Sequence, residues 1–187
     1  MIICIDSDIN PKTRDFIDDA LRFFVSKLLP DDIYKDLSIE IEFDPNMYNL
    51  GLCFPIYESE ENEEIKATYE IDDSNIVIKT VPPKDYIIYL KNKRRNLLQT
   101  LAHEAVHIKQ FATGELSRKC VLPKSDEENI SSVIETDQIN WKDLWNKEEW
   151  MPEEDEDVEY DSPWEIEAYG KEFGLVRRYK KQRKKKT

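Results

Sequence analysis

The chain has 187 residues, of which 40% are apolar, and a formal net charge of −13. This length and composition fit one globular domain with a substantial core and exclude a disordered chain. The negative charge makes nucleic acid an unfavourable partner for the domain as a whole, and no apolar run reaches membrane-spanning length.

The N-terminal half begins with a predicted helix. Asn10-Pro11 can start it, because proline suits the first helical position, and apolar residues then repeat at helical spacing as far as Leu29-Pro30. Strand-like patterns follow at residues 37–43, 50–57, 64–71, 75–81 and 85–90. The third and fourth of these flank a turn-forming Asp-Asp-Ser sequence, which predicts a hairpin.

The C-terminal half contains two predicted helices, one from about residue 92 to the stop signal Gly114 and one from Ser162 to about Arg178. Between them, residues 115–147 carry no clear pattern. Residues 148–161 include nine acidic residues, which predicts a solvated loop. Residues 177–187 carry eight of the 27 basic residues and no acid, and we expect them to form a flexible tail.

The first of these helices carries the two histidines of the chain, His103 and His107, with Glu104 directly after the first. Residues four apart lie on the same helix face, so both imidazoles can reach one metal ion. H-E-x-x-H is the zinc-hydrolase signature, in which both histidines ligate zinc. Glu104 would then act as general base on a zinc-bound water, whose pKa the metal lowers to about 7.

The two faces of this helix support a zinc site. An apolar stripe predicts contact with the core: Leu98, Leu101, Ala102, Ala105 and Ile108. A separate polar stripe holds the histidines together with Asn96, Thr100 and Gln110. A helix with one face in the core and a polar face toward a cleft suits a catalytic site. The alternative is a surface helix with two incidental histidines.

A catalytic zinc needs a third protein ligand and an open position. The chain has no third histidine, so the third ligand is predicted to be a carboxylate or the thiolate of Cys120. A glutamate on a later helix would make the site gluzincin-type.

Glu165 is the preferred third ligand. Glu167 lies four residues before Lys171 and fits an exposed ion pair, whereas Glu165 lies three residues before Ala168, whose small side chain lets another helix approach. The competing interpretation is a capping box, in which Glu165 closes the start of the helix together with Ser162.

Two segments resemble the zincin-like metallopeptidases of tailed bacteriophages: TLAHEAVHIKQFATGEL and SPWEIEAYGKEFGL. The resemblance covers residues 97–116 and 161–175, and the E-x-x-A spacing at Glu165 is also similar to that of other gluzincins. It implies a zincin fold in which His103, His107 and Glu165 ligate zinc. It also implies that Glu104 is the general base.

Tyr169 departs from that pattern, because many gluzincins have at this place an Asp or Asn that orients a zinc-binding histidine. One turn beyond Glu165, Tyr169 is a candidate hydrogen-bond donor to an oxyanion, with half-buried packing as the alternative.

We therefore expect one α+β, zincin-like domain over residues 1–176: a mixed sheet packed on the H-E-x-x-H helix, with the third ligand from a later C-terminal helix. The predicted function is hydrolysis of peptide bonds in a peptide or protein substrate, with Zn²⁺ as cofactor. The strand at 85–90 would be an edge for an extended peptide to pair with. The alternative function is a non-catalytic, zinc-stabilised virion structural or assembly protein.

The resemblance also implies other virion proteins as partners. Nucleic acid is not expected as a partner except through the basic tail, for which folding back on the acidic segment 148–161 or a disordered end is favoured, and a membrane is not expected. Cys4, Cys53 and Cys120 are scattered and odd in number, which predicts reduced thiols, and the N-terminus lacks a signal-peptide pattern. The expected location is therefore a virion or the host cytoplasm.

Overall fold

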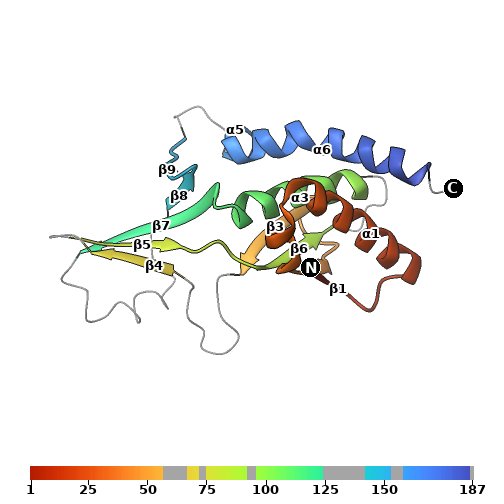
Figure 1. Cartoon of the computed structure of the whole chain (residues 1–187), viewed down its shortest axis with the longest axis horizontal. Helices are drawn as coiled ribbons and strands as arrows, with labels where there is room; N and C mark the ends of the chain where they lie inside the picture. Colours follow the sequence, from red (N-terminus) through yellow and green to blue (C-terminus); the bar gives the residue numbers. More distant parts are fainter. Residues whose placement is uncertain (57–66, 72–74, 92–95, 124–141, 153–157, 186–187) are drawn as a thin grey trace.

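The computed structural model describes residues 1–56, 67–71, 75–91, 96–123, 142–152 and 158–185 (Figure 1). It is a mixed α+β structure with two sheets, which confirms the predicted class. The predicted hairpin turn and residues 153–157 of the predicted acidic loop lie outside the described residues. The ends of that predicted loop are not loop: they form strand β9 (Glu148–Glu149) and helix α5 (Val158–Asp161).

The first sheet has four strands in the order β1 (Ile2–Ile5), β2 (Ser38–Phe43), β6 (Asp85–Leu90) and β3 (Gly51–Ile56). The first three are parallel, and β3 pairs antiparallel with β6. Three of the four strands lie where the sequence predicts them, and β1 is an addition.

The position of β6 corrects one expectation. β6 was expected to be an edge strand, but it pairs with β2 on one side and β3 on the other. Its alternate side chains Tyr86, Ile88 and Leu90 are buried in the core, which explains its central place. The edge strands of this sheet are β1 and β3, and Pro55 of β3, which has no N–H to donate, is tolerated in such a strand.

The second sheet has five antiparallel strands: β4 (Ala67–Ile71), β5 (Asn75–Thr80), β7 (Leu116–Pro123), β8 (Lys142–Trp145) and β9 (Glu148–Glu149). Pairing of β4 with β5 confirms the predicted hairpin. The sequence did not predict β7 to β9. In Figure 1, β4, β5 and β7 project away from the helices.

The helices are α1 (Pro11–Leu28), α2 (Asp31–Lys35), α3 (Leu97–Ala112), α5 (Val158–Asp161) and α6 (Pro163–Arg183). Asn10 caps α1, and Gly114, with φ +70°, follows the end of α3. α6 continues past the predicted end near Arg178, so the basic segment expected to be a flexible tail is helical as far as Arg183. No helix in the described ranges is long and apolar enough to cross a membrane.

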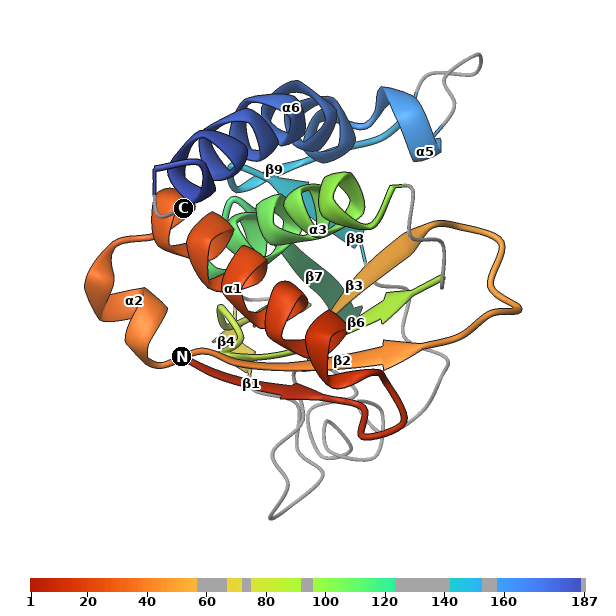
Figure 2. The ribbon, with the colours of Figure 1, turned by 90° about the vertical axis from the view of Figure 1, so that its right-hand side faces the viewer.

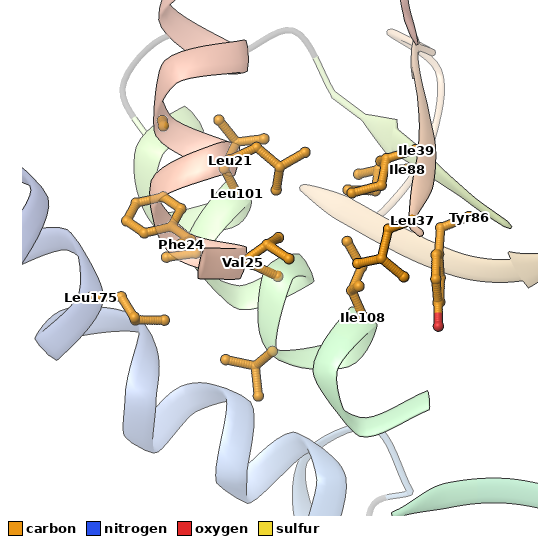
Figure 3. Packing of buried hydrophobic residues seen from close by; sticks show 14 of the residues in the cluster. Leu21, Phe24, Val25, Leu37, Ile39, Tyr86, Ile88, Leu101, Ile108 and Leu175 are labelled. Carbon is orange, nitrogen blue, oxygen red and sulfur yellow. The ribbon is translucent and has the colours of Figure 1, made fainter. Parts of the chain in front are cut away.

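The main core lies where α1 and α3 cover one face of the four-stranded sheet. Figure 3 shows Leu21 and Val25 of α1 facing Leu101 of α3 and Ile39 and Ile88 of the sheet. α6 forms a further layer over α1 and α3 (Figure 2).

α6 is attached to α1 through Leu175 and Tyr179, which are both buried. The Tyr179 hydroxyl donates a hydrogen bond of 2.8 Å to Asp19 of α1. Burial and this hydrogen bond raise the pKa of Tyr179 to about 12. α6 is therefore held by its apolar side and presents its other side to solvent.

Replacement of Leu175 by alanine tests this attachment. Leu175 is 4% exposed, and Leu175→Ala should lower the free energy of unfolding by about 2–4 kcal/mol through lost burial and a residual cavity. Ile166→Ala on the same helix is the matched control. Ile166 is 59% exposed, so its truncation should change stability by no more than about 0.5 kcal/mol. Urea denaturation measures both, and equal effects would contradict the packing of α6.

Candidate metal centre

Three side chains from α3 and α6 meet at one point. The Nε2 atoms of His103 and His107 lie 3.1 Å apart. One carboxylate oxygen of Glu165 lies 3.1 Å from Nε2 of His103, and the other lies 3.2 Å from Nε2 of His107. These three residues form the group of described side chains that could hold a metal ion.

The polar stripe of α3 lies where the sequence places it. The apolar stripe is inside the core, with Leu101, Ala102, Ala105 and Ile108 fully buried. Asn96, Thr100, His103 and His107 line a cavity of about 540 Å³ on the opposite side. The 3.6-residue helical period thus separates the packing face from the face that carries the histidines.

Each histidine is oriented by a second hydrogen bond. Nδ1 of His103 lies 3.2 Å from a carboxylate oxygen of Glu172, which also accepts a hydrogen bond from Gln99. Nδ1 of His107 lies 2.8 Å from the side-chain oxygen of Gln110. Since both partners are acceptors, both Nδ1 atoms are donors, and the two Nε2 atoms face Glu165, where each can carry a proton or bind a metal ion.

The Gln110 side chain is itself fixed. Its amide nitrogen donates 2.8 Å hydrogen bonds to the carbonyl oxygen of Trp164 and to the carboxylate of Glu167. Glu167 also pairs with Lys109 of α3 and, as predicted, with Lys171 of its own helix. A chain of contacts from Glu167 through Gln110 therefore sets the ring of His107.

The electrostatics of the three central groups reflect their closeness. Burial alone would lower the pKa of His107, but its hydrogen bond to Glu165 and the charge of Glu104 raise that pKa to about 9. Burial would raise the pKa of Glu165, yet hydrogen bonds from both histidines bring it to about 2. The site therefore favours a positive charge among these atoms, supplied by a proton or a metal ion.

The separations fit zinc. Tetrahedral zinc with bonds of about 2.0–2.1 Å places neighbouring ligand atoms about 3.4 Å apart. Here the two Nε2 atoms lie 3.1 Å apart, and different oxygens of Glu165 lie 3.1 Å from one and 3.2 Å from the other. Taken as one atom per residue, the three candidate ligand atoms all lie within 4.8 Å of one another. Two neutral imidazoles and one carboxylate are also a donor set that zinc enzymes use. The residues present therefore fit a zinc ion.

Glu104 lies beside this group and against the edge strand. It is 3% exposed, and a Cβ atom added to Gly51 of β3 would come within 2.5 Å of its carboxylate oxygen. Burial raises the pKa of Glu104, an effect that the nearby histidines partly oppose. Glycine at position 51 thus leaves room for Glu104 between the sheet and the cavity.

Tyr169 lies at the side of the cavity, with its ring centre 4.7 Å from that of His103. It stacks on Tyr160, with ring centres 6.2 Å apart. The position is compatible with contact to a bound ligand, and the oxyanion role of Tyr169 stays a prediction.

Two alternatives from the sequence are not seen in the structure. Ser162 is the N-cap of α6, but its side chain makes no capping hydrogen bond, and Glu165 points to the histidines instead of forming a capping box. Cys120 lies in β7 and is not among the residues that line the cavity. Glu165 is thus the carboxylate that the fold brings to both histidines.

Two supporting residues were not assigned such roles from the sequence. Glu172 lies seven residues after Glu165, two helical turns along the same face, so helical spacing could have indicated it. Glu167 was expected on an exposed side, but its contacts with Lys109 and Gln110 place it between α3 and α6.

No protein-family model, curated protein or solved structure matches this chain. A functional proposal for this chain therefore rests on the geometry of the site and not on a known relative.

The contacts of Glu167 predict a pH-dependent contribution to stability. Burial would raise its pKa, but hydrogen bonds from Lys171, Gln110 and Lys109 lower it to about 2. The stabilisation should therefore be present above about pH 4.5, the ordinary value, and be lost as the pH falls toward 2. Because Glu167 is partly exposed and solvent screens its ion pairs, this stabilisation should be on the order of 2 kcal/mol.

Urea denaturation of metal-free wild type and Glu167→Gln between about pH 7 and about pH 2.5 measures this contribution. The difference in free energy of unfolding should shrink as the pH falls. A difference that stays constant with pH would show that the Glu167 charge is not stabilised by its neighbours.

Proposed function

We propose that this chain is a zinc-dependent metallopeptidase of gluzincin type, with His103, His107 and Glu165 as zinc ligands. The convergence of two imidazole Nε2 atoms and one carboxylate, all within 3.2 Å of a neighbour, is the observation that supports this proposal most strongly. The mixed sheet against α3, with the third ligand on the later helix α6, is compatible with a zincin-like fold.

The cavity and Glu104 favour an enzyme over a structural zinc site. Structural zinc sites are usually closed by four protein ligands, whereas catalytic sites have three and an open position. Here three candidate ligands line a cavity of about 540 Å³. A structural site needs no base, yet a buried glutamate lies beside the ligands.

The residues have separate roles in the proposed reaction. Zinc, when bound, would acidify a water molecule and polarise the scissile carbonyl. Glu104 would accept a proton on its carboxylate and pass it to the leaving amine, and its raised pKa suits a base that works near neutral pH. Glu172 and Gln110 would hold the imidazoles by their Nδ1–H groups.

β3 offers a place for an extended peptide. In the described part of the chain β3 pairs with β6 on one side only, and residues 50–53 line the cavity beside Glu104. A peptide could add to this edge by backbone hydrogen bonds and pass close to the metal centre. This role replaces the one expected for residues 85–90. Association with virion proteins stays a prediction from the resemblance.

The first prediction from this proposal concerns metal content. Protein purified without chelators should contain about one zinc per chain, measured by elemental analysis. His103→Ala and His107→Ala should each abolish tight binding, because two ligands and water hold zinc poorly. Metal-free wild type at neutral pH would count against the proposal.

Graded zinc affinities separate the roles of the glutamates. Glu165→Gln removes a ligand and should weaken binding most, while Glu172→Gln removes only the orienting partner of His103 and should cost roughly 10–100-fold. Glu167 contacts His107 only through Gln110, so Glu167→Gln should weaken zinc affinity less than either of the other two substitutions. Chelator competition measures all three, and unchanged affinity in Glu165→Gln would remove Glu165 from the ligand set.

A further prediction separates the enzyme from a structural protein. Glu104→Gln retains the size of the side chain but removes the base, so it should keep zinc and fold. Its hydrolysis of a peptide library should fall roughly 100-fold or more. Wild type that binds zinc but cleaves no peptide in the library would favour the non-catalytic alternative.

A further inference from the structure

The C-terminal half of α6 carries a surface that the proposed metal centre does not use. Residues 177–185 contain seven lysines and arginines, and no acidic residue follows Glu172 in the sequence. Figure 2 shows this end of α6 far along the helix from α5, whose Tyr160 lines the metal-site cavity.

An open groove of about 610 Å³ follows this face of α6. Its lining residues recur at helical spacing: Phe173, Val176, Arg177, Lys180, Lys181 and Lys184. Phe173 is 67% exposed, a high value for a phenylalanine side chain. Within the described residues, none of the four cations makes an ion pair. The groove thus combines an exposed aromatic ring with uncompensated positive charge.

We propose that this groove binds a single-stranded nucleic acid, with phosphates along the four cations and an unpaired base against Phe173. Seven residues separate Arg177 from Lys184, which is about 10 Å along a helix. Cations spread over that length can contact successive phosphates of one strand. Basic side chains beside an aromatic ring are the combination by which proteins bind single strands. This binding does not depend on the proposed peptidase activity.

The packing of α6 argues against a lipid surface as the ligand. A helix that lies in a membrane interface inserts its apolar face. One apolar face of α6 is already occupied, because Ala168, Leu175 and Tyr179 are buried in the protein, whereas Ile166 and Phe173 are exposed on other sides of the helix. Beyond Phe173, every groove-lining side chain except that of Val176 is cationic, which suits phosphates better than acyl chains.

The distribution of charge favours a narrow, flexible ligand. The whole chain has a net charge of −13, so a broad polyanion would meet repulsion outside the groove. A duplex also keeps its bases stacked, which leaves no free base face for Phe173. An acidic peptide could neutralise the lysines but has no base to cover that ring.

Fluorescence anisotropy with a labelled oligothymidylate tests the proposal on full-length protein at low salt. Lys180→Glu combined with Lys184→Glu should weaken binding roughly tenfold or more and flatten its salt dependence. Phe173→Ala should weaken it roughly five- to tenfold with little change in salt dependence, because it removes stacking and no charge. Lys12→Glu with Lys35→Glu, the same charge change on exposed lysines of α1 and α2, is the matched control.

Three comparisons decide the nature of the ligand. A duplex of the same sequence should bind more weakly and should not respond to Phe173→Ala. Vesicles that contain phosphatidylserine should not retain the protein, and polyglutamate should compete poorly at equal charge. Equal loss in the control variant, absence of oligothymidylate binding, or preferential binding to vesicles or polyglutamate would each overturn the proposal. Circular dichroism and urea denaturation check that each variant is folded.

Discussion

The close packing of α6 on α3 is the constraint on which the rest of the site depends. Ala168 has no exposed surface, and its small side chain allows the two helix backbones to approach. Glu165 and Glu172 lie on the same face of α6, on either side of Ala168, and each contacts His103. A larger residue at position 168 would separate the helices and with them both carboxylates. The contact that stabilises the fold therefore also assembles the candidate ligands.

This packing places several carboxylates where water cannot solvate them fully, which is costly unless cations compensate. Lys109 and Lys171 both pair with Glu167, which lies two residues after Glu165. These two lysines therefore neutralise Glu167 and not Glu165. Glu165 then has the two histidines as its partners. A divalent cation between these atoms would lower the electrostatic cost further, because Glu104 and Glu172 add negative charge on either side.

The sequence was most informative where the signal is local. The period of α3, the capping of α1 and the β4–β5 hairpin depend on neighbours within a few residues, and all three agree with the structure. The order of strands depends on long-range pairing, so β6, which lies between β2 and β3, was wrongly expected to be an edge strand. β7 was missed because the polar run Ser117 to Lys119 interrupts its apolar pattern, and β8 and β9 were missed because they are short and charged. Glu172 was missed because its role exists only once α6 lies on α3.

The charge pattern of α6 connects its two ends. Glu165 lies in the first turn, and Lys180, Lys181 and Arg183 lie in the last, which matches the helix dipole at both termini. The helix is thus stabilised by the same arrangement that puts a carboxylate at the metal centre and cations far from it. If the lysines lay near the first turn, they would pair with Glu165 and compete with any metal for its oxygens. Separating the two charges along one helix lets a single element carry an anionic ligand and a cationic surface.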